Sequence, residues 1–181
     1  MLEVMDRAEF DAVFRMMEEA FPPDERRPAA EQRALLDEPG FCLYVLRRGG
    51  RVAGFMAVRD FVQECGCTYL EHFAVAPELR GQGLGAAMLR ELAARSAGML
   101  VAEVEPPDTE TARRRIAFYC SQGFCLNAHD YVQPPISAGR NPVPLRIVSA
   151  PQALDDAGFL RLRNTLYRRV YRCGGQGVSP A

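Results

Sequence analysis

Three glycines, an arginine and a run of helix-forming residues lie together in the segment from Arg80 to Ala86. A strand pattern ends at Val75, so the glycines open a helix shortly after a strand. Glycine lets a ligand approach the backbone closely, and the first N–H groups of a helix have no partner within it. Because the positive end of the helix dipole lies behind those groups, the segment predicts a pyrophosphate site, with Arg80 adding positive charge.

The same glycines also satisfy a loose dinucleotide-binding fingerprint. Gly81, Gly83 and Ala86 follow its spacing, and Glu103 lies about twenty residues further on, as that fingerprint asks. Against this, the preceding strand carries Glu71, whereas a central parallel strand is nearly all apolar. An antiparallel hairpin also precedes the turn, whereas a dinucleotide-binding unit normally opens with the glycine strand. A nucleotide-binding oxidoreductase therefore stays as the less favoured alternative.

Two motifs in this order resemble the GNAT superfamily of N-acetyltransferases. Arg80, Gly83 and Gly85 match its central motif, Arg/Gln-x-x-Gly-x-Gly/Ala. Tyr119, followed by Gly123-Phe124, matches a second signature, a tyrosine near a helix end before Gly-Phe. The resemblance covers residues 1–132, and the remainder looks like the tail of a bacterial subgroup whose substrate the sequence does not identify.

The resemblance implies a fold, a coenzyme and roles for individual residues. The fold would be α/β (α+β-like), with a mixed, mostly antiparallel central sheet flanked by helices. Acetyl-CoA would be the co-substrate, and its acetyl group would pass directly to a small-molecule or peptide amine within a ternary complex. Tyr119 would protonate the leaving thiolate. The residues implied to hold the pantetheine arm or the pyrophosphate are Phe73, Ala74, Val75, Arg80, Gly81, Gln82, Gly83, Leu84, Gly85 and Ala86.

Carboxylates on predicted strands are the candidates for a base. A protonated alkylamine has a pKa of about 10 and cannot attack a thioester until its proton is removed. Glu71 is the first choice, because strand alternation places it on one face with Phe73 and Val75 and a similar Leu-Glu-Asp phrase occurs in polyamine acetyltransferases of the superfamily. Glu103 is the second, since ribosomal-protein acetyltransferases show a comparable Glu-Val step. Glu103 and Glu105, which share a strand face, are alternatively substrate-binding residues.

Other chemistry is less favoured. Alternation turns His72 away from Glu71, so it is expected to be a packed or surface residue. No histidine is placed to activate Cys120, so a covalent acyl-enzyme is not expected. The departures at Ala112 and Arg115, where the family often has Asn and Ala, remove no essential chemical role. A coenzyme A-binding module that senses or scaffolds without turnover remains an alternative function.

Composition narrows the partners. A chain of 181 residues with 48% hydrophobic residues and a net charge of −1 is typical of one globular domain and disfavours nucleic acid as the main partner. The six cysteines form no paired CxxC units, so no metal site is expected. A membrane span and a secretion signal are also absent from the pattern, which indicates a cytoplasmic protein. The sequence leaves the choice between monomer and homodimer open.

The elements that must position these residues follow from periodicity and turn signals. One domain is expected over 1–172, with a flexible tail over 173–181. Gly49-Gly50 predicts a hairpin between two strands. The predicted helices are 6–20, 28–37, 83–97, 110–121 and 152–172. The predicted strands are 41–48, 51–61, 67–75, 99–104, 124–132 and 142–149.

Overall fold

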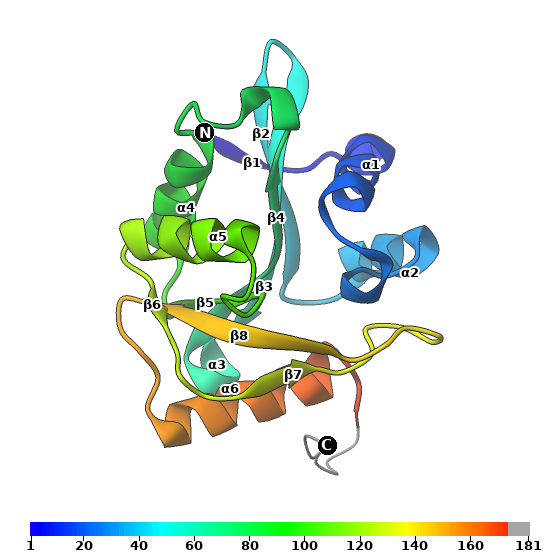
Figure 1. Cartoon of the computed structure of the whole chain (residues 1–181). Coiled ribbons are helices and arrows are strands. Elements are labelled where there is room, and N and C mark those ends of the chain that lie inside the picture. The colour runs from blue at the N-terminus through cyan, green and yellow to red at the C-terminus, as the bar shows by residue number, and fades with distance from the viewer. Residues whose placement is uncertain (174–181) are drawn as a thin grey trace.

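The chain folds around one twisted, eight-stranded sheet (Figure 1). The structure is a computed structural model and describes residues 1–173, so the predicted tail lies outside the described residues except for Cys173. The strands are β1 (Leu2–Val4), β2 (Phe41–Arg48), β3 (Arg51–Phe61), β4 (Cys67–Val75), β5 (Met99–Val104), β6 (Cys125–Leu126), β7 (Tyr131–Gln133) and β8 (Val143–Ala150). The helices are α1 (Phe10–Ala20), α2 (Ala29–Ala34), α3 (Val62–Cys65), α4 (Leu84–Arg95), α5 (Glu110–Ser121) and α6 (Asp156–Arg169).

The sheet is antiparallel except at its centre. Its strand order is β1-β2-β3-β4-β5-β8-β6, with β7 pairing beside β8. Within residues 1–173, only β4 and β5 pair in parallel, and α4 forms the crossover between them. Their pairing runs from Cys67 opposite Met99 to Leu70 opposite Ala102 and then ends. Beyond that point the two strands diverge, which leaves a gap near the middle of the sheet.

Helices cover the two faces of the sheet unequally. In Figure 1, α4 and α5 lie on one side of the central strands, α1 and α2 lie on the other, and α6 packs beside β7 and β8. Each layer has its own apolar core, because the sheet buries residues on both faces. The α4–α5 core includes Met88, Leu92 and Ile116, and the α6 core includes Phe159 and Leu162. The gap between β4 and β5 therefore opens between the layers.

Local sequence accounts for most element boundaries. The Gly49-Gly50 hairpin forms as predicted, with φ values of +55° and +74° that suit the twist of paired strands. The Thr109 side chain caps α5 by accepting from the Ala112 N–H at 3.1 Å. Asp6 and Glu9 form a capping box at the first helical turn. Helices α4 and α6 are shorter than predicted, beginning at Leu84 and Asp156.

Several predicted elements are wrong or missing. The single strand predicted over 124–132 is two short strands, β6 and β7. Asn127 lies between them with a buried side chain, whose amide donates to the Ile147 carbonyl and whose oxygen accepts from the Leu154 N–H. Strand β1 and helix α3 were not predicted. Both are short, at 3 and 4 residues, and a period cannot be read from so few positions.

A β-bulge changes which face of β4 carries which side chain. Ala57 of β3 pairs with His72 and Val58 pairs with Leu70, so Glu71 is the extra residue. Phe73 and Val75 pack with the α4–α5 core. Glu71 and His72 both contact the segment between α1 and α2 on the opposite side. The prediction that Glu71 shares a face with Phe73 and Val75, and that His72 points away from Glu71, is therefore wrong, because a bulge interrupts strand alternation.

Candidate active site

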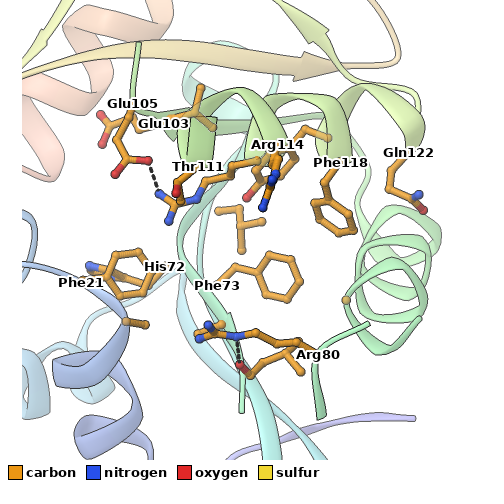
Figure 2. Close-up of a pocket in the computed structure, with 18 of the residues that line it drawn as sticks. Phe21, His72, Phe73, Arg80, Glu103, Glu105, Thr111, Arg114, Phe118 and Gln122 are labelled. Carbon is orange, nitrogen blue, oxygen red and sulfur yellow. Dashed lines mark hydrogen bonds and ion pairs between the residues drawn. The ribbon is translucent and has the colours of Figure 1, made fainter. Parts of the chain in front are cut away.

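The gap between β4 and β5 opens into a cavity of about 1120 Å³. One end lies at the N-terminus of α4 and under α5, where Arg80, Phe73 and Phe118 line it (Figure 2). The other end reaches Glu25 and Gln133 on the side of α1 and β7. The cavity thus runs through the sheet, joining two environments that the sequence could not place together.

The glycine turn has the geometry of an anion site. Gly81 and Gly83 both adopt φ of +76°, which is left-handed backbone that glycine takes without strain. Gly83 is the residue before α4, and no side chain caps the helix there. The first intrahelical bond runs from the Ala87 N–H to the Gly83 carbonyl, so the N–H groups before it have no partner within the helix. These groups and the helix dipole favour a bound phosphate.

Arg80 and Gly85 define the mouth of this site. The Arg80 Nε donates to the Val75 carbonyl at 3.1 Å, which holds the guanidinium across the end of β4 (Figure 2). A Cβ on Gly85 would lie 3.3 Å from both the Phe73 and Phe118 rings. Any side chain there would crowd the passage between α4 and α5, so the glycine keeps a narrow channel open.

The edge of β4 beyond Leu70 offers main-chain partners. Phe73 and Val75 pair with β3 on one side, opposite Met56 and Gly54. On the other side β5 has already diverged, and both residues line the cavity. An extended ligand can therefore add to this edge as a strand would.

Tyr119 lies on α5 beside this channel. It is buried, and its ring meets Phe124 edge-on at 5.2 Å and Phe118 at 5.7 Å. Burial raises the pKa of Tyr119 to about 12, with a small opposing effect from Arg115. The hydroxyl therefore stays protonated at neutral pH, and the residue lines the cavity where a proton donor is predicted.

Glu71 is bound by two buried arginines. One carboxylate oxygen pairs with Arg27, and the other accepts from the Arg59 Nε at 2.6 Å. The Glu71 side chain is 1% exposed, and burial alone would raise its pKa. The two guanidinium charges outweigh burial and hold the pKa of Glu71 far below the ordinary 4.5. A carboxylate whose conjugate acid is so strong is a poor proton acceptor, which argues against the predicted role of Glu71 as the base.

Glu103 has the opposite environment. It reaches the cavity from β5, and tyrosine hydroxyls donate to both of its oxygens (Figure 2 labels Glu103). Tyr69 donates at 2.9 Å, Tyr131 also donates, and the Tyr171 hydroxyl lies 2.9 and 2.7 Å from the two oxygens and donates its one proton between them. Burial raises the pKa of Glu103 to about 7, the tyrosines partly oppose this, and the charge of Glu71 adds to it. Glu103 can thus take up or release a proton near neutral pH.

The remaining acidic residues sit at the rim. Glu105 pairs with Arg115 of α5 at 2.6 Å, in the contact that Figure 2 marks beside Glu105. Glu103 and Glu105 both line the cavity but have different partners, which are tyrosines of β4, β7 and the turn after α6 for Glu103 and Arg115 for Glu105. Burial and the charge of Glu105 raise the pKa of Glu25. Glu25 was not predicted as a site residue.

His72 is a packed residue, as predicted. Its Nε2 donates to the Glu25 carbonyl at 2.9 Å, and its ring meets Phe21 edge-on at 4.8 Å. Burial lowers the pKa of His72. Its Nδ1 is buried and has no hydrogen-bond partner among the described residues.

The sequence did not identify the arginines and tyrosines that give Glu71 and Glu103 different pKa values. They come from distant positions: Arg27, Arg59, Tyr69, Tyr131 and Tyr171. No motif spacing links them, because residues of β3, β4, β7 and the end of α6 meet only after the sheet forms. The one available signal was the position of Arg59 directly after the apolar run 52–58 of the same strand.

Coenzyme A fits these features. The uncapped start of α4 suits a pyrophosphate, the unpaired edge of β4 suits an amide-bearing arm, and Gly85 leaves space where a Cβ would close the channel. Residues 10–124 match the family model described as the acetyltransferase (GNAT) family. The chain belongs to the GNAT acetyltransferase family. Members use acetyl-CoA as the acetyl donor, which supports the predicted co-substrate.

Solved structures agree with the family. A GNAT-family acetyltransferase structure from Bacteroides thetaiotaomicron shares 30% identity, covers 96% of this chain and 99% of that one, and has a TM-score of 0.86. The ribosomal-protein-S18-alanine N-acetyltransferase of Escherichia coli shows the same fold at 21% identity, covering 86% and 95%, with a TM-score of 0.62. An acetyltransferase structure from Salmonella typhimurium with acetyl-CoA matches at 21% identity over 87% and 98%, with a TM-score of 0.60. The search of curated proteins found no match.

The family settles two sequence predictions. The α/β fold with a mixed, mostly antiparallel sheet is confirmed. The dinucleotide-binding alternative is wrong, because residues 10–124 match the GNAT family and, within residues 1–173, β4–α4–β5 is a single parallel unit that follows three antiparallel strands. Within residues 1–173, no helix is both long and apolar enough to cross a membrane.

Proposed function

We propose that this GNAT acetyltransferase moves an acetyl group from acetyl-CoA directly to an amine within a ternary complex. The observation that carries the proposal is the continuity of the cavity. It joins the coenzyme features at α4 and β4 to a carboxylate, Glu103, that titrates near neutral pH. A bound coenzyme and an amine can therefore meet within the gap between β4 and β5 without a covalent enzyme intermediate.

Acetyl-CoA, when bound, supplies the thioester carbonyl. The N–H groups at the start of α4 and Arg80 hold its phosphates, and the free edge of β4 from Phe73 to Val75 holds the arm. Main-chain N–H groups near Val75 lie beside the reacting carbonyl and stabilise negative charge on its oxygen. Apart from the Arg80 guanidinium, this half of the site binds the coenzyme through main-chain groups.

Glu103, and not Glu71, is the base in this proposal. An alkylammonium must lose a proton before it attacks, and a base with a pKa near the working pH takes it most effectively. Glu103 meets that condition with a pKa of about 7. Glu71 is held as a carboxylate by Arg27 and Arg59 and serves to join β3 and β4 to the segment before α2.

Tyr119 is the acid. Its pKa of about 12 keeps the hydroxyl protonated until a thiolate develops beside it. It lies on α5 at the coenzyme end of the cavity, on the other side of the gap from Glu103. The two proton transfers are therefore assigned to groups in different layers of the protein.

The acceptor is an amine that reaches the cavity as a cation. Glu25, Glu103 and Glu105 line the end away from the coenzyme, and the pKa of Glu25 is raised partly because Glu105 repels it. A positive amine relieves that repulsion. This charge pattern suits a small-molecule or a peptide amine equally, and the protein acts as a monomer or a homodimer in this proposal.

Two assays test the function in sequence. Thermal shift with acetyl-CoA, with coenzyme A and with NAD should show stabilisation by the first two only. Release of the coenzyme thiol is then followed with a panel of alkylamines and peptides. If acetyl-CoA stabilises the protein but no amine causes thiol release, the protein binds the coenzyme without catalysis. If millimolar acetyl-CoA gives no stabilisation, neither catalysis nor coenzyme binding is supported.

A further inference from the structure

The carboxylate of Glu103 rests on three tyrosines that lie behind it. Tyr69 comes from β4, Tyr131 from β7, and Tyr171 from the turn after α6. All three are buried, and none belongs to the cavity lining, whereas Glu103 does. The tyrosines therefore contact the carboxylate and not the space that substrates enter.

Two of these tyrosines come from the part of the chain that follows the matched family segment. The family model ends at residue 124, whereas Tyr131 and Tyr171 lie beyond it. Tyr171 is the only one of the three whose hydroxyl lies within hydrogen-bond distance of both Glu103 oxygens, at 2.9 and 2.7 Å, so its single proton is shared between them. Contact with both oxygens fixes the plane of a carboxylate as well as its position.

The turn that carries Tyr171 is itself anchored. The Tyr171 N–H donates to the Leu166 carbonyl at 3.1 Å, which folds the chain back at the end of α6. The preceding Val170 carbonyl accepts from the Arg27 Nη2 at 3.1 Å. Arg27 also pairs with Glu71, so one turn supports both carboxylate clusters.

We infer that the C-terminal segment 131–171 completes the active site, with Tyr131 and Tyr171 positioning Glu103 toward the cavity for proton transfer. The inference rests on the proposed function of Glu103 as the base. It assigns a role in catalysis to a segment that no family motif covers. A buried carboxylate without such donors would rotate or take up a proton, and either change would remove a competent base.

The groups that face Glu103 determine how its titration should respond. They are Tyr69 and Glu71 from β4, Tyr131 from β7, and Tyr167 and Tyr171 from α6 and its final turn. Arg27 and Arg59 offset the charge of Glu71. Hydrogen bonds from the tyrosines favour the ionised form of Glu103, so they lower its pKa against the effect of burial. Removing one donor should raise it.

Tyr171→Phe is the decisive variant. In the pH profile of kcat/KM, the acidic limb reports the protonation of Glu103. Its midpoint should move upward by about one pH unit, because the ionised carboxylate loses a hydrogen-bond donor. The rate at pH 7 should fall several-fold and recover toward the wild-type rate at higher pH, while KM for acetyl-CoA stays unchanged. A limb that does not move in a folded Tyr171→Phe protein overturns the inference.

Tyr167→Phe is the matched control. Tyr167 lies in the last turn of α6, one turn before Tyr171, but its hydroxyl donates to the Val132 carbonyl at 2.7 Å and not to Glu103. This variant loses one tyrosine hydroxyl from the same layer and should leave the acidic limb in place. An equal displacement of the limb in Tyr167→Phe would show a general structural effect and overturn the positioning role. If Tyr171→Phe fails to fold, Tyr131→Phe tests the same segment through its own donor.

A titration without coenzyme separates this inference from the proposed function. Carboxyl carbons of ¹³C-labelled glutamate are followed by NMR against pH, and Glu103→Gln identifies the Glu103 signal. An upward shift in Tyr171→Phe and none in Tyr167→Phe supports the positioning role even if no amine is acetylated. An unshifted Glu103 signal overturns it even if the wild-type protein proves to be an active acetyltransferase.

Discussion

Glu71 and Glu103 lie on the neighbouring strands β4 and β5 at the same gap, yet their pKa values are shifted in opposite directions. Arginines enclose Glu71 and hold its pKa far below the ordinary value, whereas tyrosines enclose Glu103, whose pKa is about 7 because burial prevails. A charged partner stabilises the ionised form strongly, but a neutral hydroxyl only offsets part of the cost of burial. Two carboxylates of the same type thus become a structural ion pair and a candidate base.

The two ends of the cavity differ in a similar way. The coenzyme end depends on main-chain groups and on glycines whose backbone no other residue adopts easily. The acceptor end depends on charged and hydroxyl side chains drawn from β4, β5 and the final turn. Substitutions should therefore act through chemistry at one end and through backbone geometry at the other.

Glu103→Gln should give the largest effect on activity. Loss of the base should lower kcat by about 10²- to 10⁴-fold, measured as amine-dependent release of coenzyme A thiol. The wild-type rate should fall as the pH drops below about 7, because Glu103 becomes protonated, and the variant should lack this limb. Its affinity for coenzyme A should equal that of the wild type. A variant that keeps half of the wild-type rate would restore Glu71 as the candidate.

Glu71→Gln should act on stability first. Two buried guanidinium groups lose their common anion, which should cost about 3–5 kcal/mol in the free energy of unfolding, measured by urea denaturation. The wild type should also lose stability as the pH falls below 4.5, because the folded-state pKa of Glu71 is lowered. Glu105→Gln is the control, since its pair with Arg115 is more than a third exposed and should contribute about 0–1 kcal/mol.

The activity of Glu71→Gln sharpens the comparison. Where the variant remains folded, its rate should retain the acidic limb near pH 7, because Glu103 is still present. Loss of that limb in a folded Glu71→Gln protein would contradict the assignment of the base.

Tyr119→Phe should lower kcat by a smaller factor, about tenfold to a hundredfold. A thiolate can leave without being protonated, whereas an amine that keeps its proton cannot attack, so loss of the acid costs less than loss of the base. Binding of acetyl-CoA should stay unchanged in titration calorimetry, since the ring and its contacts with Phe118 and Phe124 are kept. Tyr44→Phe removes a phenol hydroxyl from outside the cavity and should leave kcat as it is. Equal rates for Tyr119→Phe and wild type would remove the acid from the mechanism.

Gly83→Ala should have the smallest effect, about 1 kcal/mol in stability, from forcing alanine into left-handed backbone. Coenzyme A affinity should fall several-fold as well, because Gly83 sets the first turn of α4. Gly139→Ala carries a similar strain at φ of +74° in a loop that does not line the cavity, and should lower stability without changing affinity. An equal loss of affinity in both variants would mean that the turn has no special role.

The sequence by itself determined the coenzyme end of the site. The glycine turn, the strand before it and the helix after it are contiguous, so their geometry follows from local backbone preferences and from hydrogen bonds that helix ends cannot make. Apart from the four-residue helix α3, the order of strands and helices over 41–121 followed from periodicity in the same way. These features could be predicted without knowing which residues pack against them.

Only the tertiary structure decided which carboxylate can act as a base. Glu71 and Glu103 look equivalent as strand residues, and the bulge at Glu71 reverses the face that alternation predicts. Their proton affinities depend on Arg27, Arg59, Tyr131 and Tyr171, which reach them from positions up to 68 residues away from Glu103 and 44 from Glu71. Electrostatic energy depends on distance in space and on burial, and neither is a property of sequence order.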